Sequence, residues 1–385
     1  MHSDVFVTSR EIVSIIRHMP TANAVTPQPP LVPPDHTLIA RTIETRFSPR
    51  LALRQVLPLA GDASNRRYFR VTLTGGPPHS VIVMQLAEPE GFKQSEEAVS
   101  GVVHQIAELP FINVRSHLAK VKVPVPTLYY YDQSAGLLYL EDFGDVTLAD
   151  AVSRADSVQV KSRYRQAIDV LVQMQIHATR PEDQTCLAFH RGFDAPLLMW
   201  EFEHFLEYGV EVRNGKPLAD VDAAAIRRVF QNMADQLASQ PRIVTHRDYH
   251  SRNLMVDGTR LGVIDFQDAL MGPATYDLAS LVRDAYIQLD EALVDELVEY
   301  YLTHMADWGV GSTNRASFRR VFDLMSIQRN LKAAGRFVYI DRVKGNPKFL
   351  ADIPRVLSYV KRNLQKYPEL EPLRKHLTPY VPELQ

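Results

Sequence analysis

The sequence has little cysteine, almost no net charge and no long apolar run. Its 385 residues include a single cysteine, Cys186. One cysteine excludes an intramolecular disulfide and a cysteine-rich metal site, and it is typical of a protein from a reducing compartment. The 43 Lys and Arg residues nearly balance the 45 Asp and Glu residues, which gives a formal net charge of −2. Because this balance creates no strong field for nucleic acid or a membrane surface, we expect a small molecule as the partner.

The sequence also lacks the usual signals for export or membrane insertion. The N-terminal stretch MHSDVFVTSREIVSIIRHMP has no basic region, long apolar stretch or small-residue cleavage site of the kind found in signal peptides. No uninterrupted apolar run approaches the length of a membrane span. These absences predict a soluble, cytoplasmic protein that does not contact a membrane.

Proline and turn-forming residues divide the chain into three parts. The stretch TPQPPLVPP is too rich in proline for a helix or a sheet ladder, so residues 1–35 are predicted to be a disordered or extended N-terminal extension. Residues 36–144 contain extended runs separated by turn-forming clusters and are predicted to be a β-rich lobe. Residues 145–385 are predicted to be a mainly helical lobe.

The β-rich lobe is predicted to contain about five strands and one helix. LALRQVLPLA, RRYFRVTLT and SVIVMQLA read as an antiparallel meander, and VPVPTLYYYD and GLLYLEDF read as two later strands. Apolar residues at helical spacing predict a helix over 95–109. In the second lobe, helices are predicted over 147–153, 159–178, 196–208, 219–239, 276–288, 290–308, 315–340 and 351–364. Only IVTHRDYH, NLMVDG and RLGVIDF interrupt them with short extended pieces.

Two short motifs carry polar groups suited to phosphoryl transfer. HRDYHSRN supplies Asp248 and, five residues later, Asn253, and GVIDFQD supplies Asp265 after a hairpin. Asp248 is the candidate catalytic carboxylate that orients or deprotonates an attacking hydroxyl, and Asn253 and Asp265 are the candidate ligands of Mg²⁺. The alternatives are an ordinary loop-capping Asp, an Asn turn and a hairpin Asp. His246 and Arg247 are interpreted as supports of this loop.

These motifs resemble the catalytic and metal-binding loops of the protein-kinase-like fold, in its aminoglycoside phosphotransferase branch of small-molecule kinases. GDASNRRYFRV is similar to the phosphate-covering turn, LYLEDFG to the hinge that receives adenine, and GPATYDLASLVRD to the helix that supports the catalytic loop. The resemblance implies an α+β, two-lobed fold with a β-rich N-lobe and a mainly helical C-lobe, and it implies that ATP is used. It also implies that Asp277 anchors the catalytic-loop backbone.

Further stretches resemble the bacterial anomeric sugar kinases that act on N-acetylmuramate and N-acetylglucosamine in cell-wall recycling. They are GDASNRRYFR, IDFQDALMGPATYDLASLVRDAY and QRNLKAAGRF. This resemblance implies ATP- and Mg²⁺-dependent transfer of phosphate to the C1 hydroxyl of an amino sugar. Two alternatives stay open: an aminoglycoside or choline-type kinase, and a non-catalytic pseudokinase that binds a nucleotide.

The nucleotide site departs from the kinase pattern at one position. Kinases usually carry a lysine at the end of the third strand, where this sequence has Met84, and a thioether cannot neutralise phosphate. Arg66, Arg67 and Arg70 on the preceding strand are candidates to replace the lysine. Because strand side chains alternate, Arg66 and Arg70 share one face and Arg67 lies on the other.

Other binding residues are assigned by position. Ser64 lies in the phosphate-covering turn, and Glu141 and Phe143 lie in the hinge, where backbone groups would meet adenine. For the acceptor sugar, the helix LLMWEFEHFLEY offers Glu203 and His204 as hydrogen-bonding groups and Trp200 as a stacking surface. Arg329, on a late helix, is the candidate partner of a sugar carboxylate. Charged residues on helices more often form a solvated face, which is the alternative for this acceptor set.

Overall fold

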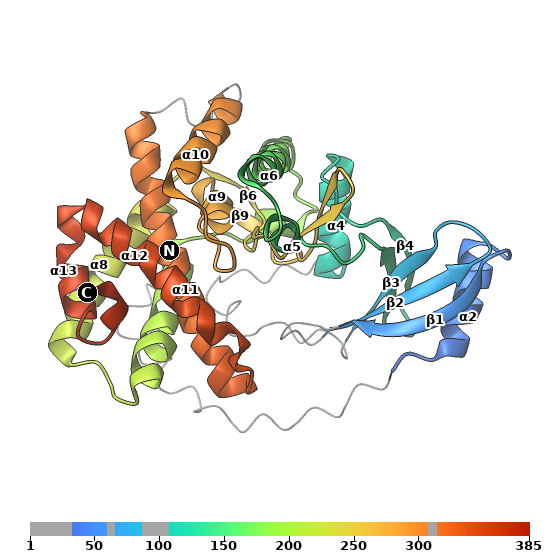
Figure 1. Ribbon diagram of the computed structural model, residues 1–385, viewed down its shortest axis with the longest axis horizontal. Helices are drawn as coiled ribbons and strands as arrows, with labels where there is room; N and C mark the ends of the chain where they lie inside the picture. The colour runs from blue at the N-terminus through green and yellow to red at the C-terminus, as the bar shows by residue number, and fades with distance from the viewer. Residues whose placement is uncertain (1–32, 60–65, 87–107, 307–313) are drawn as a thin grey trace, which may run out of the picture.

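The computed structural model describes residues 33–59, 66–86, 108–306 and 314–385. A five-stranded antiparallel sheet lies at one end of an elongated molecule, and helices form most of the remainder (Figure 1). The predicted α+β class is therefore confirmed. Most of the extension predicted over residues 1–35 and most of the helix predicted over 95–109 fall outside the described residues.

The sheet has the strand order β1-β2-β3-β5-β4, with antiparallel neighbours throughout. Its strands are β1 (Ala52–Leu59), β2 (Arg67–Thr74), β3 (Ser80–Gln85), β4 (Leu128–Asp132) and β5 (Leu137–Glu141). The predicted meander and the two later strands are confirmed. The short helix α2 (His36–Thr42), which the sequence pattern did not predict, begins at the Asp35 cap and covers one face.

The two faces of the sheet belong to different cores because side chains alternate along each strand. Phe69 and Val71 of β2 pack with Ile39 of α2 in a small core. Met84 of β3, which is fully buried, joins the large core shared with the helical part, and Tyr68 packs against that core. The face that carries Met84 is therefore the one turned toward the catalytic motifs.

The remainder of the described chain is mainly helical, and a helix is present at each of the eight predicted ranges. The helices are α4 (Pro110–Lys120), α5 (Leu148–Val152), α6 (Ser157–His177), α7 (Ala195–His204), α8 (Asp220–Ala238), α9 (Thr275–Val282), α10 (Glu291–Ala306), α11 (Arg315–Lys344), α12 (Ile353–Lys366) and α13 (Glu371–Leu377), with the π-helical segments η1 (Ile43–Phe47) and η3 (Phe205–Val212) and the 3₁₀ segments η2 (Leu187–His190), η4 (Pro347–Asp352), η5 (Pro368–Leu370) and η6 (Pro382–Leu384). Helices α4 and α13 were not predicted. No described helix is both long and apolar enough to cross a membrane.

Two small antiparallel ladders bring the sequence motifs together. Strand β6 (Arg242–Thr245) pairs with β9 (Leu270–Pro273), which was not predicted, and β7 (Leu254–Asp257) pairs with β8 (Arg260–Val263). The loop 246–253 leaves β6 and enters β7, while the loop 264–269 leaves β8 and enters β9. The two motif loops therefore connect the same pair of ladders, which places them side by side.

The hinge that follows β5 packs against the β7–β8 hairpin. The Phe143 ring lies so close to Gly262 that a Cβ atom added there would come within 2.5 Å of the ring. Arg260 of β8 forms an ion pair with Glu141 and lies over the Phe143 ring. These contacts hold the end of the sheet beside the strand that leads to Asp265.

Candidate active site

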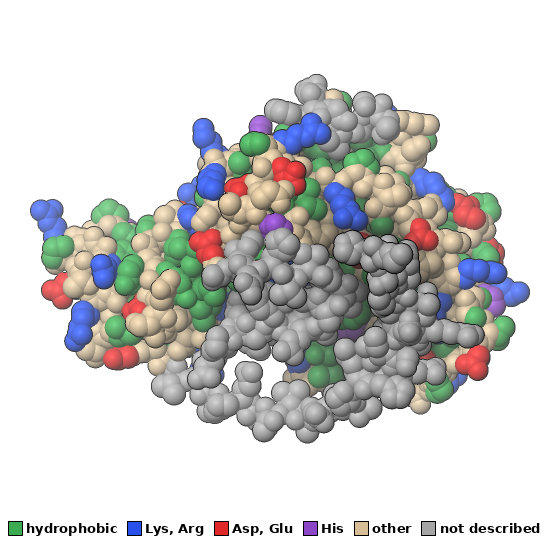
Figure 2. All heavy atoms as spheres, turned by 180° about the vertical axis from the view of Figure 1, so that it is seen from behind, with side chains coloured by type: hydrophobic (Ala, Val, Ile, Leu, Met, Phe, Trp, Pro, Cys, Tyr) green, Lys and Arg blue, Asp and Glu red, His purple; other side chains and the backbone are tan. Residues whose placement is uncertain are grey.

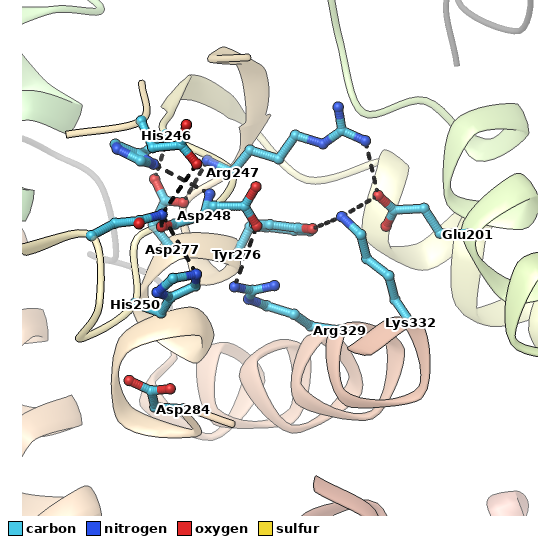
Figure 3. Close-up of polar contacts among 12 residues, drawn as sticks. Glu201, His246, Arg247, Asp248, His250, Tyr276, Asp277, Asp284, Arg329 and Lys332 are labelled. Carbon is cyan, nitrogen blue, oxygen red and sulfur yellow. Dashed lines mark hydrogen bonds and ion pairs between the residues drawn. The ribbon is translucent and has the colours of Figure 1, made fainter. Parts of the chain in front are cut away.

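The start of loop 246–253, the candidate catalytic loop, is anchored by a buried carboxylate. Asp277 lies in the first turn of α9 and is fully buried. Its two oxygens accept hydrogen bonds from the backbone N–H groups of His246, at 2.6 Å, and Arg247, at 2.9 Å. Burial raises the pKa of Asp277 to about 6, because desolvation outweighs the hydrogen bonds that favour the ionised form. The anchoring contact expected from the resemblance is present (Figure 3).

His246 connects the two motif loops. Its Nε2 donates to the carbonyl oxygen of Ile264 at 2.9 Å, and its Nδ1 accepts from the backbone N–H of Asp248 at 3.2 Å. Because one ring nitrogen donates and the other accepts, these contacts select the neutral tautomer with the proton on Nε2. His246 therefore supports the loops, as predicted.

A second buried carboxylate holds the far end of the catalytic loop. The chain leaves α9 after Val282, and Asp284 then turns toward the loop, where its Oδ2 accepts from the Ser251 N–H at 2.8 Å. Its Oδ1 accepts from the Tyr286 N–H at 2.8 Å, and the residue is 1% exposed. The sequence interpretation missed Asp284, although it follows Asp277 by seven residues in the stretch that resembles the supporting helix.

The three residues predicted to carry the chemistry converge. Asn253 Nδ2 donates to the backbone oxygen of Asp248 at 2.9 Å and lies 3.5 Å from Asp265 Oδ2. Gln267 Nε2 donates to the other oxygen of Asp265 at 2.9 Å. Asp265 and Arg247 both have positive φ, 64° and 81°. Non-glycine residues rarely adopt this conformation, and when they do they often lie at functional sites.

The Asn253 and Asp265 pair fits the requirements of Mg²⁺. The hydrogen bonds of the Asn253 side chain use Nδ2, which leaves its amide oxygen available as a ligand. Magnesium prefers oxygen ligands and is commonly held by one or two protein groups together with phosphate oxygens and water. A larger protein cage is unnecessary, and the described residues contain no group of three or more His, Cys, Asp or Glu arranged to hold a metal.

Asp248 lies in a strongly positive environment. Arg329 Nη2 of α11 is 3.8 Å from Asp248 Oδ1, and the Asp248 side chain is 40% exposed. Desolvation opposes ionisation of this carboxyl group, but the charges of Lys332 and Arg329 outweigh it. The pKa of Asp248 is therefore well below its usual range, and the group is a carboxylate at neutral pH.

Behind Asp248 lies a buried ion network that sequence reasoning missed (Figure 3). Glu201 of α7 is fully buried, and its carboxylate contacts Lys332 Nζ at 2.6 Å, Gln328 Nε2 at 2.7 Å and Arg247 Nη2 at 3.2 Å. Lys332 also donates to the Tyr276 hydroxyl at 3.0 Å. The network links the catalytic loop to α7, α9 and α11.

The three arginines that are candidates to bind the nucleotide phosphates lie in different surroundings. Arg70 forms ion pairs with Asp142 at 2.7 Å and Asp145 at 2.6 Å, so its charge is used to hold the hinge. Arg67 lies on the same side of β2 as the residues that pack toward α2, away from the motif loops. Arg66 directly precedes β2. Ser64 lies outside the described residues.

The two hinge residues have structural partners. The Glu141 side chain accepts from the backbone N–H of Thr127 at 3.0 Å and pairs with Arg260. The Glu141 backbone N–H donates to the Thr127 carbonyl oxygen at 2.9 Å. Phe143 is buried against Gly262. These contacts position the hinge, while its part in adenine binding stays a prediction.

The candidate acceptor residues are only partly brought to the catalytic loop. Arg329 of α11 lies beside Asp248. Glu203 pairs with Arg227 of α8 at 2.8 Å, on the side of α7 opposite Glu201, so the structure does not place it near Asp248. The His204 ring lies among aromatic rings of α7, η3 and α11.

Comparisons with known proteins agree with this geometry. The sequence model of the phosphotransferase enzyme family matches residues 55–312. The N-acetylmuramate/N-acetylglucosamine kinase of Pseudomonas putida is 33% identical over 315 residues, which cover 82% of this chain and 85% of that protein. The enzyme of the same name from Neisseria meningitidis is 32% identical over 320 residues, covering 82% and 87%.

Solved structures show the same fold. An ADP-bound aminoglycoside phosphotransferase, APH(2'')-Ib, has a TM-score of 0.54 at 12% identity and covers 84% of this chain and 98% of its own. A choline/ethanolamine kinase family protein from Mesorhizobium loti has a TM-score of 0.53 at 15% identity, with coverages of 89% and 97%. The predicted family and kinase-like fold are thus confirmed: the chain belongs to the phosphotransferase enzyme family and is an enzyme that transfers phosphate from a nucleotide to a hydroxyl group of a small molecule.

Proposed function

We propose that this enzyme uses ATP and Mg²⁺ to phosphorylate the anomeric hydroxyl of N-acetylmuramate, N-acetylglucosamine or both, in the recycling of cell-wall sugars. The names of the relatives support the choice of acceptor. The observation that carries the proposal is the convergence of Asp248, Asn253 and Asp265 in loops that Asp277 and His246 hold together. The proposal includes a cytoplasmic location, where ATP is available.

In this mechanism Asp248 orients the sugar hydroxyl. The hydroxyl oxygen attacks the γ-phosphorus, the bond to the ADP oxygen breaks, and the hydroxyl proton passes to the Asp248 carboxylate. Because the pKa of Asp248 is low, the carboxylate orients the hydroxyl first and takes its proton late, as phosphate arrives. Asn253 and Asp265 would hold Mg²⁺, which supplies neutralising charge to the phosphates when it is bound.

The nucleotide is proposed to bind between the sheet and the motif loops. Residues 36–144 form the nucleotide lobe and residues 145–385 the catalytic and acceptor lobe in this proposal. Backbone groups near Glu141 and Phe143 meet adenine, and Ser64 contacts phosphate. Of the candidate cations, Arg66 is proposed to replace the missing lysine, because it lies closest in sequence to the phosphate-covering turn and alternation places it on the Met84 face, whereas Arg67 lies on the other face.

A panel of acceptors tests the proposal. Purified protein with ATP and Mg²⁺ should release ADP with N-acetylglucosamine or N-acetylmuramate, and much less with choline or aminoglycosides. Asp248→Asn should lose about 10²–10⁴-fold in kcat while nucleotide affinity is kept. Asp257→Asn, at an exposed carboxylate of the β7–β8 turn, is the matched control. An Asp248→Asn variant with wild-type turnover would remove Asp248 from its role.

Two alternatives make different predictions in the same panel. An aminoglycoside kinase needs a broadly acidic surface for a polycation, whereas acidic and basic side chains intermingle over the described part of the face in Figure 2. A non-catalytic nucleotide-binding protein is favoured by Met84, which is buried where kinases have lysine. Nucleotide binding with no acceptor turned over would support this second alternative.

A further inference from the structure

Two stripes of partly exposed side chains lie side by side near the catalytic loop. Their members are Arg329, Lys332, Arg336 and Tyr339 on α11 and Trp200, His204 and Tyr208 on α7 and η3. Within each stripe the members are three or four residues apart, so each stripe occupies one face of its helix. We call the pair of stripes the α7–α11 seam.

The seam begins at the catalytic carboxylate. Arg329 lies 3.8 Å from Asp248, and Lys332 reaches across to Glu201 of α7 (Figure 3). At the far end the rings of Tyr208 and Tyr339 meet edge to face, with centroids 5.0 Å apart. The seam therefore runs from Asp248 along both helices.

The two helices approach closely in the middle of the seam because one residue is glycine. A Cβ atom added to Gly335 of α11 would lie 2.8 Å from the Cα atom of Phe205 in η3. The close approach lets the His204 ring contact Tyr339, with centroids 5.5 Å apart. The Trp200 ring lies nearly parallel to His204, at 15°. The seam thus carries four aromatic rings, and rings of this kind can contact the C–H groups of a sugar ring through their negative π surfaces.

Arg336 is the cation of the seam that has no carboxylate partner. Its guanidinium carbon lies 4.8 Å from the centroid of the Tyr339 ring, and within the described residues it forms no ion pair or hydrogen bond with another side chain. Lys332, by contrast, is neutralised by Glu201, and Arg329 faces Asp248. Seven residues separate Arg336 from Arg329, which is about 10 Å along a helix axis.

This arrangement suits an acceptor with two distinct ends. Its reacting hydroxyl must lie at Asp248, and an anionic group on the other side of the sugar ring would then point along the seam. From the sequence, Arg329 was the candidate partner of that anionic group. Arg329 is less suited, because it already faces the Asp248 carboxylate at the point where the hydroxyl must bind.

We propose that Arg336 binds the carboxylate of an anionic sugar acceptor while the aromatic side chains of the seam contact its ring. Arg336 then determines specificity, because it favours N-acetylmuramate, which carries a carboxylate, over N-acetylglucosamine, which carries none. The inference rests on the proposed function and deepens it. Loss of the Arg336 charge would remove one charge-assisted interaction with the first sugar and nothing from the second.

The test compares both sugars in the full-length enzyme. Arg336→Met should lower kcat/KM for N-acetylmuramate by roughly 10–100-fold, mainly through KM, since one charge-assisted hydrogen-bonded pair has about this value. For N-acetylglucosamine, kcat/KM should stay within about twofold, because no charge is recognised. Arg336→Lys should recover part of the loss. Arg342→Met, on another face of α11 and paired with Asp341, is the matched control.

Each outcome decides a different question. An equal loss on both sugars, or no loss on N-acetylmuramate, overturns the role of Arg336 and leaves the proposed function intact. A wild-type enzyme that accepts N-acetylglucosamine but not N-acetylmuramate also contradicts the role. A wild-type enzyme that phosphorylates neither sugar overturns the proposed function, and the role of Arg336 with it.

Discussion

Replacing Glu201 with Gln tests the centre of the buried ion network. Glutamine keeps the size and shape of the side chain but removes its negative charge. Lys332, whose side chain is only 17% exposed, would then lose its counter-ion, and the Arg247 guanidinium, 10% exposed, would lose its contact with a carboxylate charge at Glu201. The amide oxygen of the new side chain can still accept from Gln328, so the loss is mainly one of charge.

The expected effect on stability is large. Removing one partner of a buried ion pair costs about 3–5 kcal/mol, because the other partner remains buried without compensation. In the wild type, burial opposes ionisation of Glu201, yet the charges of Lys332 and Arg247 outweigh it and lower the pKa of Glu201. The carboxylate is therefore ionised, and we expect Glu201→Gln to lower the free energy of unfolding by about 3–5 kcal/mol.

The measurement is urea unfolding followed by circular dichroism, with linear extrapolation to water. Glu203→Gln is the matched control two residues further along α7. Its carboxylate is 30% exposed and pairs with Arg227, which is 46% exposed. Such partly solvated pairs contribute about 0–1 kcal/mol.

A second variant separates charge from shape. Adding Lys332→Met to Glu201→Gln removes the buried cation that Glu201 neutralises, so the double variant should be more stable than the sum of the single effects implies. If Glu201→Gln lowers the free energy of unfolding by less than about 1 kcal/mol, or no more than Glu203→Gln does, the buried network does not support the fold in the way described.

Two further predictions concern the anchors of the catalytic loop. Because the pKa of Asp277 is about 6, kcat should fall as pH drops below about 6, where the protonated carboxyl group no longer accepts from both backbone N–H groups. Asp277→Asn should have a low kcat, and its pH–rate profile should lack this decrease at acidic pH. A variant whose pH–rate profile keeps the decrease would contradict the assignment. Asp284→Ala removes the acceptor of the Ser251 N–H and should lower kcat by about 10–100-fold while nucleotide affinity stays the same. Steady-state kinetics and nucleotide titration measure the two quantities. An unaltered kcat would show that the contact between Asp284 and Ser251 is dispensable.

The convergence of Asp248, Asn253 and Asp265 could be predicted from the sequence because its signal is local. Asp248 and Asn253 lie in one loop, and Asp265 follows one hairpin later, so the motifs HRDYHSRN and GVIDFQD together predicted that these side chains meet. Eight helices of the second part were also predictable, since each carries its own periodic pattern, whereas the short helix α13 was not predicted. Glycine and proline marked the ends of the strands in the first part.

The ion network could not be found in the same way. Glu201 and Lys332 are far apart in the sequence, and each resembles an ordinary charged residue on a solvated helix. Their pairing depends on how α7 packs on α11. One signal was present: Glu201 falls within the apolar stripe of Leu198, Phe202 and Phe205, whereas Glu203 falls outside it.

The nucleotide site was the least predictable part. Strand alternation correctly separated Arg67 from Arg70, but it could not show that Arg70 is engaged by Asp142 and Asp145, which lie more than 70 residues further along the chain. Local sequence carries no information about such a partner. The role of Ser64 and the cation that meets the phosphates stay predictions.

The close contact between Phe143 and the β7–β8 hairpin is possible only because residue 262 is glycine. The Phe143 ring occupies the space that any side chain at this position would need. Even one methyl group would push Phe143 and the segment that follows β5 away from the strand that ends near Asp265. The distance between the end of β5 and the loop that carries Asp265 is thus set, in part, by the absence of a single carbon atom.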